Sequence, residues 1–199
     1  MTKIAIFASG SGSNFQAIVE AVRAGDVRVS IEMLICDQPG AFCVIRAEEL
    51  GVPVLTFRPK DYPSKKAYEE EVLAAMHEKG IEWIILAGFM RLIGPALLEA
   101  YPNRILNIHP SLLPAFPGKD AVGQAIAAGV KVSGVTIHYV DAGMDTGPII
   151  AQEAITIEEG DDAARVHQKI QQVEHRLYPA VIEKVCNRQG EQKWQQSVH

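Results

Sequence analysis

Short apolar runs alternate with helical patterns through the first half of the chain, and this alternation constrains the fold more than any other feature of the sequence. The runs lie at residues 3–8, 29–36, 52–57, 82–87 and 106–108, and the helical patterns at 15–24, 41–50, 63–79 and 95–100. Continuous runs of Val, Ile and Leu are typical of strands buried on both faces of a parallel sheet. Strands that alternate with helices therefore predict an α/β protein with a doubly wound, mostly parallel sheet.

The alternation of strands and helices ends after Gly118, and the rest of the sequence predicts a hairpin and a long helix. The expected elements are a helix at 121–128, strands at 130–140 and 148–157, and a C-terminal helix at 161–186. The short segment between the two strands suits a hairpin connection. We expect one domain over residues 1–199, in which 187–199 form a polar tail with little apolar surface to bury.

Composition narrows the classes of protein to which the chain can belong. Its 199 residues are 22% charged, with a net charge of −5 and no basic block, which argues against nucleic acid or an anionic membrane as a partner. Three cysteines without a C-x-x-C pair give no disulfide framework. We find no signal-peptide pattern and no apolar run that could span a bilayer, so we expect a cytoplasmic protein. Its oligomeric state, monomer or homodimer, stays open.

A candidate reaction centre lies at the end of the run at 106–108, where the sequence reads Asn107-Ile108-His109-Pro110. Strand alternation places the Asn107 amide and the His109 imidazole on the same side. Pro110 ends the strand directly after them. Ligands of open α/β sheets bind at the carboxyl ends of strands, where an amide and an imidazole together suggest a reaction centre. The alternative is that both side chains satisfy backbone groups under a proline-stiffened loop.

A candidate anion site lies in the Gly/Ser segment 9–14, between the first expected strand and the first expected helix. A helix N-terminus presents free backbone N–H groups and a positive dipole end, which suit a phosphate. Ser13 followed by Gln16 fits a capping box at that end of the helix. The alternative is a tight turn that needs glycine for its backbone alone.

Two classes of protein fit these two sites. In a dinucleotide-binding protein of NAD type, Gly10 and Gly12 would begin the phosphate fingerprint, and Asp37 would hold a ribose hydroxyl. The third glycine of that fingerprint falls at Phe15, which is too bulky for the close helix packing that this glycine permits. In a transferase, the first half of the chain would hold a phosphorylated substrate, and the strand end at 107–109 would act on a carbonyl group.

Several segments resemble the glycinamide ribonucleotide formyltransferases of purine synthesis. They read Ala-Ser-Gly-Ser-Gly-Ser-Asn at 8–14, Leu-Ala-Gly-Phe-Met-Arg at 86–91 and Asn-Ile-His-Pro-Ser-Leu-Leu-Pro at 107–114, and the loop at 141–148 joins them. The resemblance covers 3–182. The segment at 107–114 is shared with formyltransferases that act on methionyl-tRNA or on sugar nucleotides, so another amine acceptor is the alternative. The Gly/Ser segment specifies the acceptor better.

The resemblance implies a Rossmann-like formyltransferase fold and a direct transfer reaction. The formyl group of 10-formyltetrahydrofolate would pass to the amine of glycinamide ribonucleotide in de novo purine biosynthesis, through a tetrahedral intermediate. These two small molecules would be the partners. The six histidines show no metal-ligand spacing, so we expect no metal. Residues 1–100 would form the acceptor-phosphate half, and 101–186 the folate and catalytic half.

The resemblance also implies roles for individual residues. The acceptor phosphate would bind to Gly12, Ser13 and Asn14, the acceptor ribose and amine would lie near Glu174, and catalysis would use Asn107, His109 and Asp145. The folate would contact Lys65, Met90, Arg91, Leu92, Ile93, Asn107, Asp141, Ala142, Gly143 and Met144. Lys66 is the alternative to Lys65, and a solvated helix carboxylate is the alternative for Glu174.

In the implied mechanism the three catalytic residues act on one developing charge. Asn107 would donate a hydrogen bond to the formyl oxygen. His109 would stabilise the tetrahedral intermediate and transfer a proton, and Asp145 would keep its imidazole charged. The alternative for Asp145 is that it caps a turn through its own backbone. His138 is expected to have a structural role near Asp145.

Overall fold

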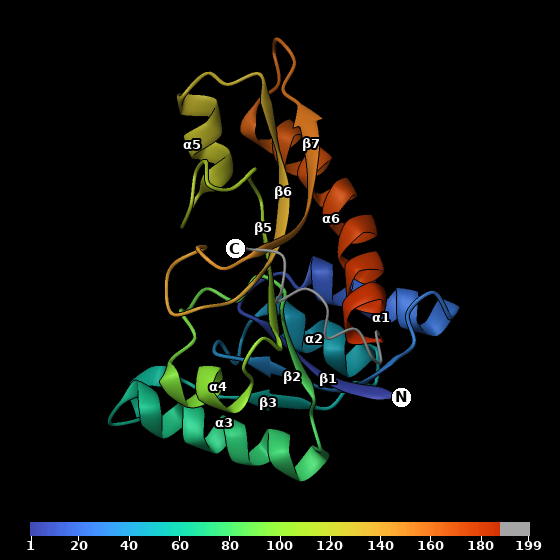
Figure 1. Cartoon of the computed structure of the whole chain (residues 1–199), viewed down its shortest axis with the longest axis vertical. Coiled ribbons are helices and arrows are strands. Elements are labelled where there is room, and N and C mark those ends of the chain that lie inside the picture. Colours follow the sequence, from blue (N-terminus) through green and yellow to red (C-terminus); the bar gives the residue numbers. More distant parts are fainter. Residues whose placement is uncertain (188–199) are drawn as a thin grey trace, which may run out of the picture.

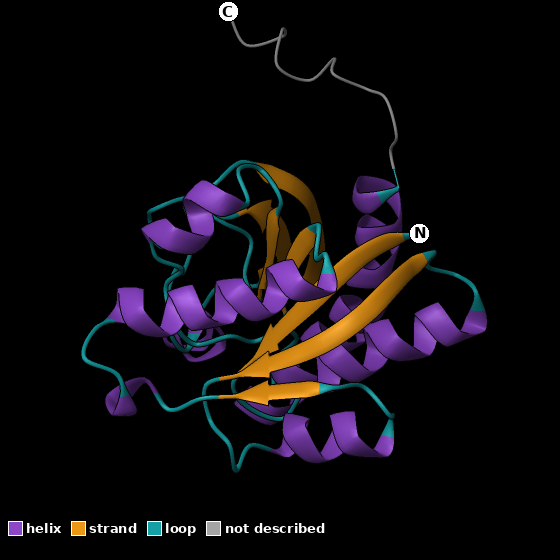
Figure 2. Ribbon diagram, turned by 90° about the horizontal axis from the view of Figure 1, so that it is seen from below, coloured by secondary structure: helices purple, strands orange, loops and turns teal. Residues whose placement is uncertain are grey.

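The computed structural model describes residues 1–187 as a seven-stranded sheet with helices on both faces (Figure 1, Figure 2). The strands are β1 (Thr2–Ala8), β2 (Val29–Cys36), β3 (Val54–Thr56), β4 (Trp83–Leu86), β5 (Ile105–His109), β6 (Val132–Tyr139) and β7 (Ile149–Thr156). The helices are α1 (Ser13–Ala24), α2 (Phe42–Glu49), α3 (Lys65–Lys79), α4 (Pro95–Ala100), α5 (Ala121–Ala127) and α6 (Ala163–Cys186), with a 3-10 helix η1 (Pro59–Asp61). The predicted α/β fold with a long C-terminal helix is confirmed.

The strands follow the order β3-β2-β1-β4-β5-β6-β7 across the sheet. All pairs from β3 to β5 are parallel, whereas β5–β6 and β6–β7 are antiparallel. The expected hairpin is therefore β6–β7, and β5 joins it to the parallel part. The chain order reverses between β1 and β4, and the strand ends beside such a reversal are where α/β sheets bind ligands.

The central strand β1 is buried on both faces, which explains why its sequence does not alternate between apolar and polar residues. Ile4 and Ile6 belong to the core on one face, and Ala5 and Phe7 belong to the core on the other. Helices α1 and α6 pack together over the first face, and α3 and α4 pack together over the second (Figure 1). The two cores leave the strand ends as the place for a polar site.

The first helix begins at Ser13, and the capping box expected at its N-terminus is wrong. Gly12 is the N-cap with φ 74°, in the left-handed region, and no side chain caps the helix there. The Gln16 backbone N–H donates to the Gly12 carbonyl oxygen at 2.9 Å, and the Gln16 side-chain oxygen accepts a hydrogen bond from Arg46. The Gln16 side chain therefore points to α2 and not back to the start of its own helix.

The ends of the described chain bear on two further expectations. The polar tail expected at 187–199 lies outside the described residues from 188 onward. Within residues 1–187, no helix combines the length and the apolar composition needed to cross a bilayer. Cys36, Cys43 and Cys186 are buried free thiols.

One buried hydroxyl ties the long helix α6 to two parallel strands. Tyr178 is fully buried, and its hydroxyl oxygen lies 2.9 Å from the Leu86 carbonyl oxygen and 3.2 Å from the Leu106 carbonyl oxygen. Leu86 ends β4, and Leu106 precedes Asn107 in β5. Burial raises the pKa of Tyr178 well above its usual value, so the hydroxyl keeps the proton that it donates. The contact supports both strands next to the strand ends.

Replacing Tyr178 with Phe should destabilise the fold without changing its secondary structure. The substitution leaves buried carbonyl oxygens without their donor, so we expect the free energy of unfolding to fall by about 1–3 kcal/mol. Urea unfolding followed by circular dichroism measures this change. An unchanged unfolding midpoint would show that the hydroxyl contributes nothing to holding α6 on the sheet.

Candidate active site

Two adjoining cavities lie at the carboxyl ends of the central strands. The larger has a volume of about 450 Å³ and is lined by the loop after β4, the end of β5 and the loop between β6 and β7. The smaller has a volume of about 190 Å³ and is lined by the Gly/Ser segment and one face of α6. Both are lined by Gly88, Met90, Ile108, Pro110 and His167, so they meet beside the end of β5.

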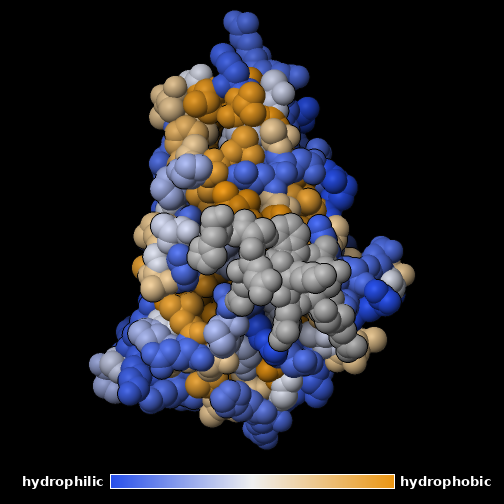
Figure 3. Space-filling view, in the orientation of Figure 1, coloured by the Kyte–Doolittle hydropathy of each residue, from blue (hydrophilic) through white to orange (hydrophobic). Residues whose placement is uncertain are grey.

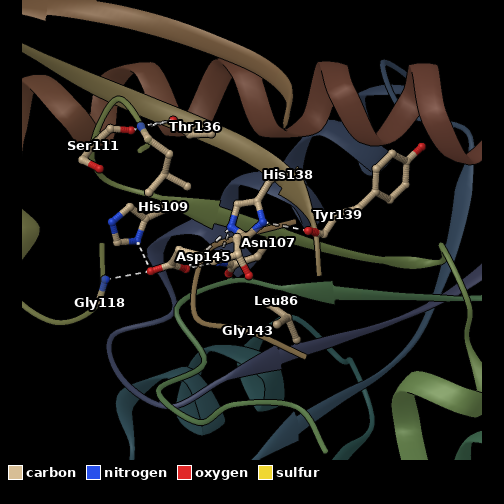
Figure 4. A network of polar contacts seen from close by, with 12 residues as sticks. Leu86, Asn107, His109, Ser111, Gly118, Thr136, His138, Tyr139, Gly143 and Asp145 are labelled. Carbon is tan, nitrogen blue, oxygen red and sulfur yellow. Dashed lines mark hydrogen bonds and ion pairs between the residues drawn. The ribbon is translucent and has the colours of Figure 1, made fainter. Parts of the chain in front are cut away.

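The three predicted catalytic side chains lie together at this end of β5 (Figure 4). Asp145, from the loop between β6 and β7, places Oδ2 at 3.4 Å from His109 Nδ1 and Oδ1 at 3.4 Å from Asn107 Nδ2. Oδ2 also accepts the Gly118 backbone N–H at 2.8 Å. The carboxylate therefore accepts a hydrogen bond from the loop at Gly118 while it faces the β5 side chains.

His109 is buried, and each of its ring nitrogens faces an oxygen atom. Nε2 lies 2.8 Å from the Phe116 carbonyl oxygen, and Nδ1 faces Asp145 Oδ2. A carbonyl oxygen can only accept, so Nε2 carries a hydrogen. The imidazolium is the only form that donates from both nitrogens, and the site offers an acceptor to each of them.

The Asn107 amide is held by a second buried histidine. Its Nδ2 lies 3.1 Å from His138 Nε2, while His138 Nδ1 lies 2.8 Å from the Tyr139 carbonyl oxygen. Because that carbonyl accepts, Nδ1 of His138 carries a hydrogen, and its Nε2 faces both the Asn107 amide and, at 3.6 Å, Asp145 Oδ1. His138 thus orients the amide, and the 3.4 Å contact with Asp145 is the weaker of the two amide contacts.

The surroundings of Asp145 favour its charged form. Burial raises the pKa of its carboxyl, but the His138 side chain, the Gly118 N–H and the positive charges of the two neighbouring histidines outweigh burial and hold the pKa below its usual value. The residue has φ 55°, in the left-handed region that Asp tolerates better than most residues. Gly147 permits this loop path, because a Cβ there would overlap the Tyr139 carbonyl oxygen.

Most of the residues expected to contact the folate line the larger cavity. These are Met90, Arg91, Leu92, Ile93, Asn107, Asp141, Gly143 and Met144. Ala142 lies in the same loop as Asp141 but does not line the cavity, and Lys65 is an exposed residue at the start of α3 outside its lining. Met90 and Met144 expose large apolar side chains. Apolar surface is visible on the left of Figure 3, at the level of the loop between β6 and β7. Apolar side chains therefore form part of the cavity rim.

The expected anion site lines the smaller cavity. Gly12, Ser13 and Asn14 form one side, and Glu174 of α6 forms another. Asn14 Nδ2 donates to Glu174 Oε2 at 3.0 Å, and Glu174 is only 7% exposed, so the alternative of a solvated helix carboxylate is wrong. A Cβ at Gly12 would lie 2.6 Å from Cys43 Cβ, so glycine lets α2 pack directly against the loop.

The features expected of a dinucleotide site are used otherwise in the structure. Asp37 is 2% exposed, and its Oδ2 accepts a hydrogen bond from Arg91 Nε at 2.7 Å. Phe15 is fully buried in the core where that class of protein needs a glycine. Both observations count against a ribose site at the end of β2. Among residues 1–187, no group of three or more His, Cys, Asp or Glu side chains is placed to hold a metal ion.

Three parts of the site were not identified from the sequence. The Phe116 carbonyl and the Gly118 N–H are backbone groups. Every residue has such a carbonyl, and every residue except proline has such an N–H, so no sequence pattern marks these two. His167 is different, because helical spacing places it on the same face of α6 as Glu174, seven residues further on. That spacing would have placed His167 beside Glu174, and the structure shows both lining the smaller cavity.

Comparison with known proteins identifies the class of protein. Residues 2–182 match the formyl transferase family, and the chain belongs to this family. Phosphoribosylglycinamide formyltransferase of Bacillus subtilis is 52% identical over 193 residues, which are 96% of this chain and 99% of that protein. A crystal structure of phosphoribosylglycinamide formyltransferase from Bacillus halodurans has a TM-score of 0.91 and 57% identity, covering 94% of this chain and 96% of that one. The resemblance expected from the sequence is confirmed.

A longer relative shows the same match over part of its length. The trifunctional purine biosynthetic protein adenosine-3 of Drosophila pseudoobscura pseudoobscura is 40% identical over 182 residues. The match covers 90% of this chain and 13% of that protein. The unit described here therefore corresponds to one segment of the longer chain.

Replacing Glu174 with Gln should remove a pH dependence of stability. Burial raises the pKa of Glu174 from 4.5 to about 7, and the Asn14 hydrogen bond opposes this only in part. The folded chain thus binds this proton more tightly than the unfolded chain, so the stabilising effect is complete below the unfolded pKa and is lost as the pH rises through about 7. Relative to the variant, the wild-type free energy of unfolding should fall by about 2–4 kcal/mol over this range.

Urea unfolding of both proteins at a series of pH values measures the difference. The comparison cancels the titration of groups that the two proteins share. A difference that stays constant from acid to neutral pH would contradict a raised pKa at Glu174.

Proposed function

We propose that this chain transfers the formyl group of 10-formyltetrahydrofolate to the amine of glycinamide ribonucleotide in purine biosynthesis. The observation that carries the proposal is that a cavity lined by the Gly/Ser segment and a larger apolar cavity meet at the end of β5, beside Asn107 and His109. The names of the relatives at 52% and 57% identity support the same acceptor. The alternative with another amine acceptor lacks this support.

The two cavities suit the two substrates. A volume of about 450 Å³ falls in the usual range for sites of drug-sized ligands, and its apolar lining suits a planar ring system. The folate would lie against residues 90–93 and 141–144. The backbone N–H groups of Gly12, Ser13 and Asn14 begin a helix and would bind the acceptor phosphate, with Glu174 beside the ribose and amine. Residues 1–100 supply the phosphate loop and 101–186 the catalytic residues of one domain.

The reaction needs no nucleophile from the enzyme, because the neutral acceptor amine is itself nucleophilic. The amine nitrogen bonds to the formyl carbon and gives up one proton. The bond from that carbon to the folate nitrogen breaks once the folate nitrogen has taken a proton, so the net proton movement is from the amine to the folate. Asn107 exchanges its long contact with Asp145 for the oxyanion, to which it donates. The His109 imidazolium, held between Asp145 and Phe116, stabilises the same charge and moves the proton.

We also propose a cytoplasmic location, with a monomer or a homodimer as the working form. Buried free thiols at Cys36, Cys43 and Cys186 suit a reducing compartment. Neither substrate requires a membrane or a nucleic acid.

An acceptor comparison tests the proposal directly. With 10-formyltetrahydrofolate as donor, we expect turnover with glycinamide ribonucleotide and none above background with an amino-sugar nucleotide or with water alone. Absorbance of the deformylated folate measures the rate. Equal turnover with the sugar nucleotide would assign the chain a different acceptor.

The Asn107→Ala variant should lower kcat by roughly 10²–10³, the usual loss for one oxyanion donor.

Replacing Asp145 with Asn separates catalysis from turn formation. Asn retains an oxygen for the Gly118 N–H and tolerates a left-handed backbone, but it cannot balance a cation at His109. We expect kcat to fall on the order of 10²–10⁴, with both KM values and the melting temperature little changed. Steady-state kinetics and calorimetry measure these. Near-native kcat would make Asp145 a turn residue.

A further inference from the structure

Two buried carboxylates contact the loop 88–94, which follows β4 and forms one wall of the larger cavity. Asp37 follows β2 and Glu69 belongs to α3, so they approach the loop from different elements. Each is only 2% exposed. Neither lines the cavity, and the mechanism above uses neither of them.

The first contact is an ion pair to the middle of the loop. Asp37 Oδ2 accepts from Arg91 Nε at 2.7 Å. Its second oxygen, Oδ1, is buried and has no hydrogen-bond partner among residues 1–187. The Arg91 charge is thus balanced from behind the wall, which leaves the backbone of the loop to meet a ligand.

The second contact reaches the end of the loop. Glu69 Oε1 accepts the Gly94 backbone N–H at 2.6 Å, and Oε2 is buried without a hydrogen-bond partner in the described part of the chain. Burial raises the pKa of Glu69, while the Gly94 N–H and the Lys65 charge oppose that rise. A Cβ at Gly94 would overlap the carboxylate, so glycine is what permits this approach.

These contacts are a costly way to stabilise a fold. A buried carboxylate with one unpaired oxygen loses hydration that an apolar side chain of similar size would not lose. What the contacts supply is a defined position for the loop. Met90 is 67% exposed and Leu92 is 48% exposed, so packing does not fix the side chains that flank Arg91. The Glu69 contact holds the loop backbone directly at Gly94, and the Asp37 contact holds the loop through the Arg91 side chain.

We infer that Asp37 and Glu69 are positioning residues for the folate, which hold the loop 88–94 in the form that receives its ring system. The inference rests on the proposed function. Neither side chain touches the substrate, and each acts through the loop residue that it binds. Loss of either contact should therefore weaken folate binding while the acceptor site and the reacting groups stay intact.

Paired variants test this inference. Asp37→Ala and Glu69→Met remove the contacts, whereas Asp37→Asn and Glu69→Gln retain an acceptor oxygen of nearly the same shape. We expect the removing variants to raise the KM for 10-formyltetrahydrofolate about tenfold, the loss for one charge-assisted hydrogen bond. The acceptor KM and kcat should stay within about twofold. Glu69→Gln should restore the folate KM, and Asp37→Asn should restore it in part because the charge is lost.

A matched control separates positioning from general charge loss. Arg28 and Glu183 form an ion pair far along the chain from the loop, with Arg28 exposed. Glu183→Gln should leave both KM values unchanged. A folate KM that rises equally in this control, or an acceptor KM that rises as much as the folate KM in Asp37→Ala and Glu69→Met, would overturn the inference.

Direct binding keeps this inference distinct from the proposed function. Calorimetry with tetrahydrofolate is carried out on the wild-type chain and on all four variants. A wild-type chain that binds no folate would contradict the proposed function itself. A wild-type chain that binds folate, with Asp37→Ala and Glu69→Met binding it equally well, would contradict only the positioning role. Weaker binding by these two variants, recovered in Glu69→Gln, supports it.

Discussion

The Asp145 carboxylate is the contact on which the arrangement of the site depends. It accepts the N–H of Gly118, in the loop that follows β5. It also faces Asn107 and His109 of β5 and His138 of β6. Without acceptor oxygens at this point, those segments would present several donors to one another and no common acceptor. Low local dielectric strengthens each of these contacts. The Asp145 oxygens therefore hold the loop between β6 and β7 against the end of β5, while the negative charge acts on His109.

The sequence predicted the architecture because each central strand is buried on both faces and so reads as an unbroken apolar run. Asn107 and His109 could be paired from strand alternation alone, since both lie in one strand. Asp145 could not be placed by spacing, because the antiparallel return of β6 beside β5 brings it to His109. The capping box at Ser13 failed because a tertiary contact, from Arg46 to Gln16, took the side chain that the local motif required. Local patterns were reliable where long-range contacts did not compete with them.

The pKa values of two buried carboxyls at the site shift in opposite directions, and the number of donors around each explains why. Glu174 receives one amide hydrogen bond from Asn14, so burial dominates and raises its pKa to about 7. At Asp145, two histidines and the Gly118 N–H outweigh the effect of burial, so the pKa of its carboxyl falls below the usual value. One carboxyl can therefore hold or release a proton near neutrality at the smaller cavity, while the other stays charged beside the imidazole. Such a separation assigns different tasks to chemically similar groups.

The walls of the two cavities are not independent of each other. The Ser9 backbone N–H donates to the Gly88 carbonyl oxygen at 3.1 Å, and the Ser9 hydroxyl accepts the Met90 N–H at 2.9 Å. Ser9 belongs to the segment that would hold the acceptor phosphate, and Gly88 and Met90 belong to the wall that would hold the folate. Two hydrogen bonds therefore connect the walls of the two cavities. Direct transfer requires both reactants to be held in one geometry, and this connection links the segments that would hold them.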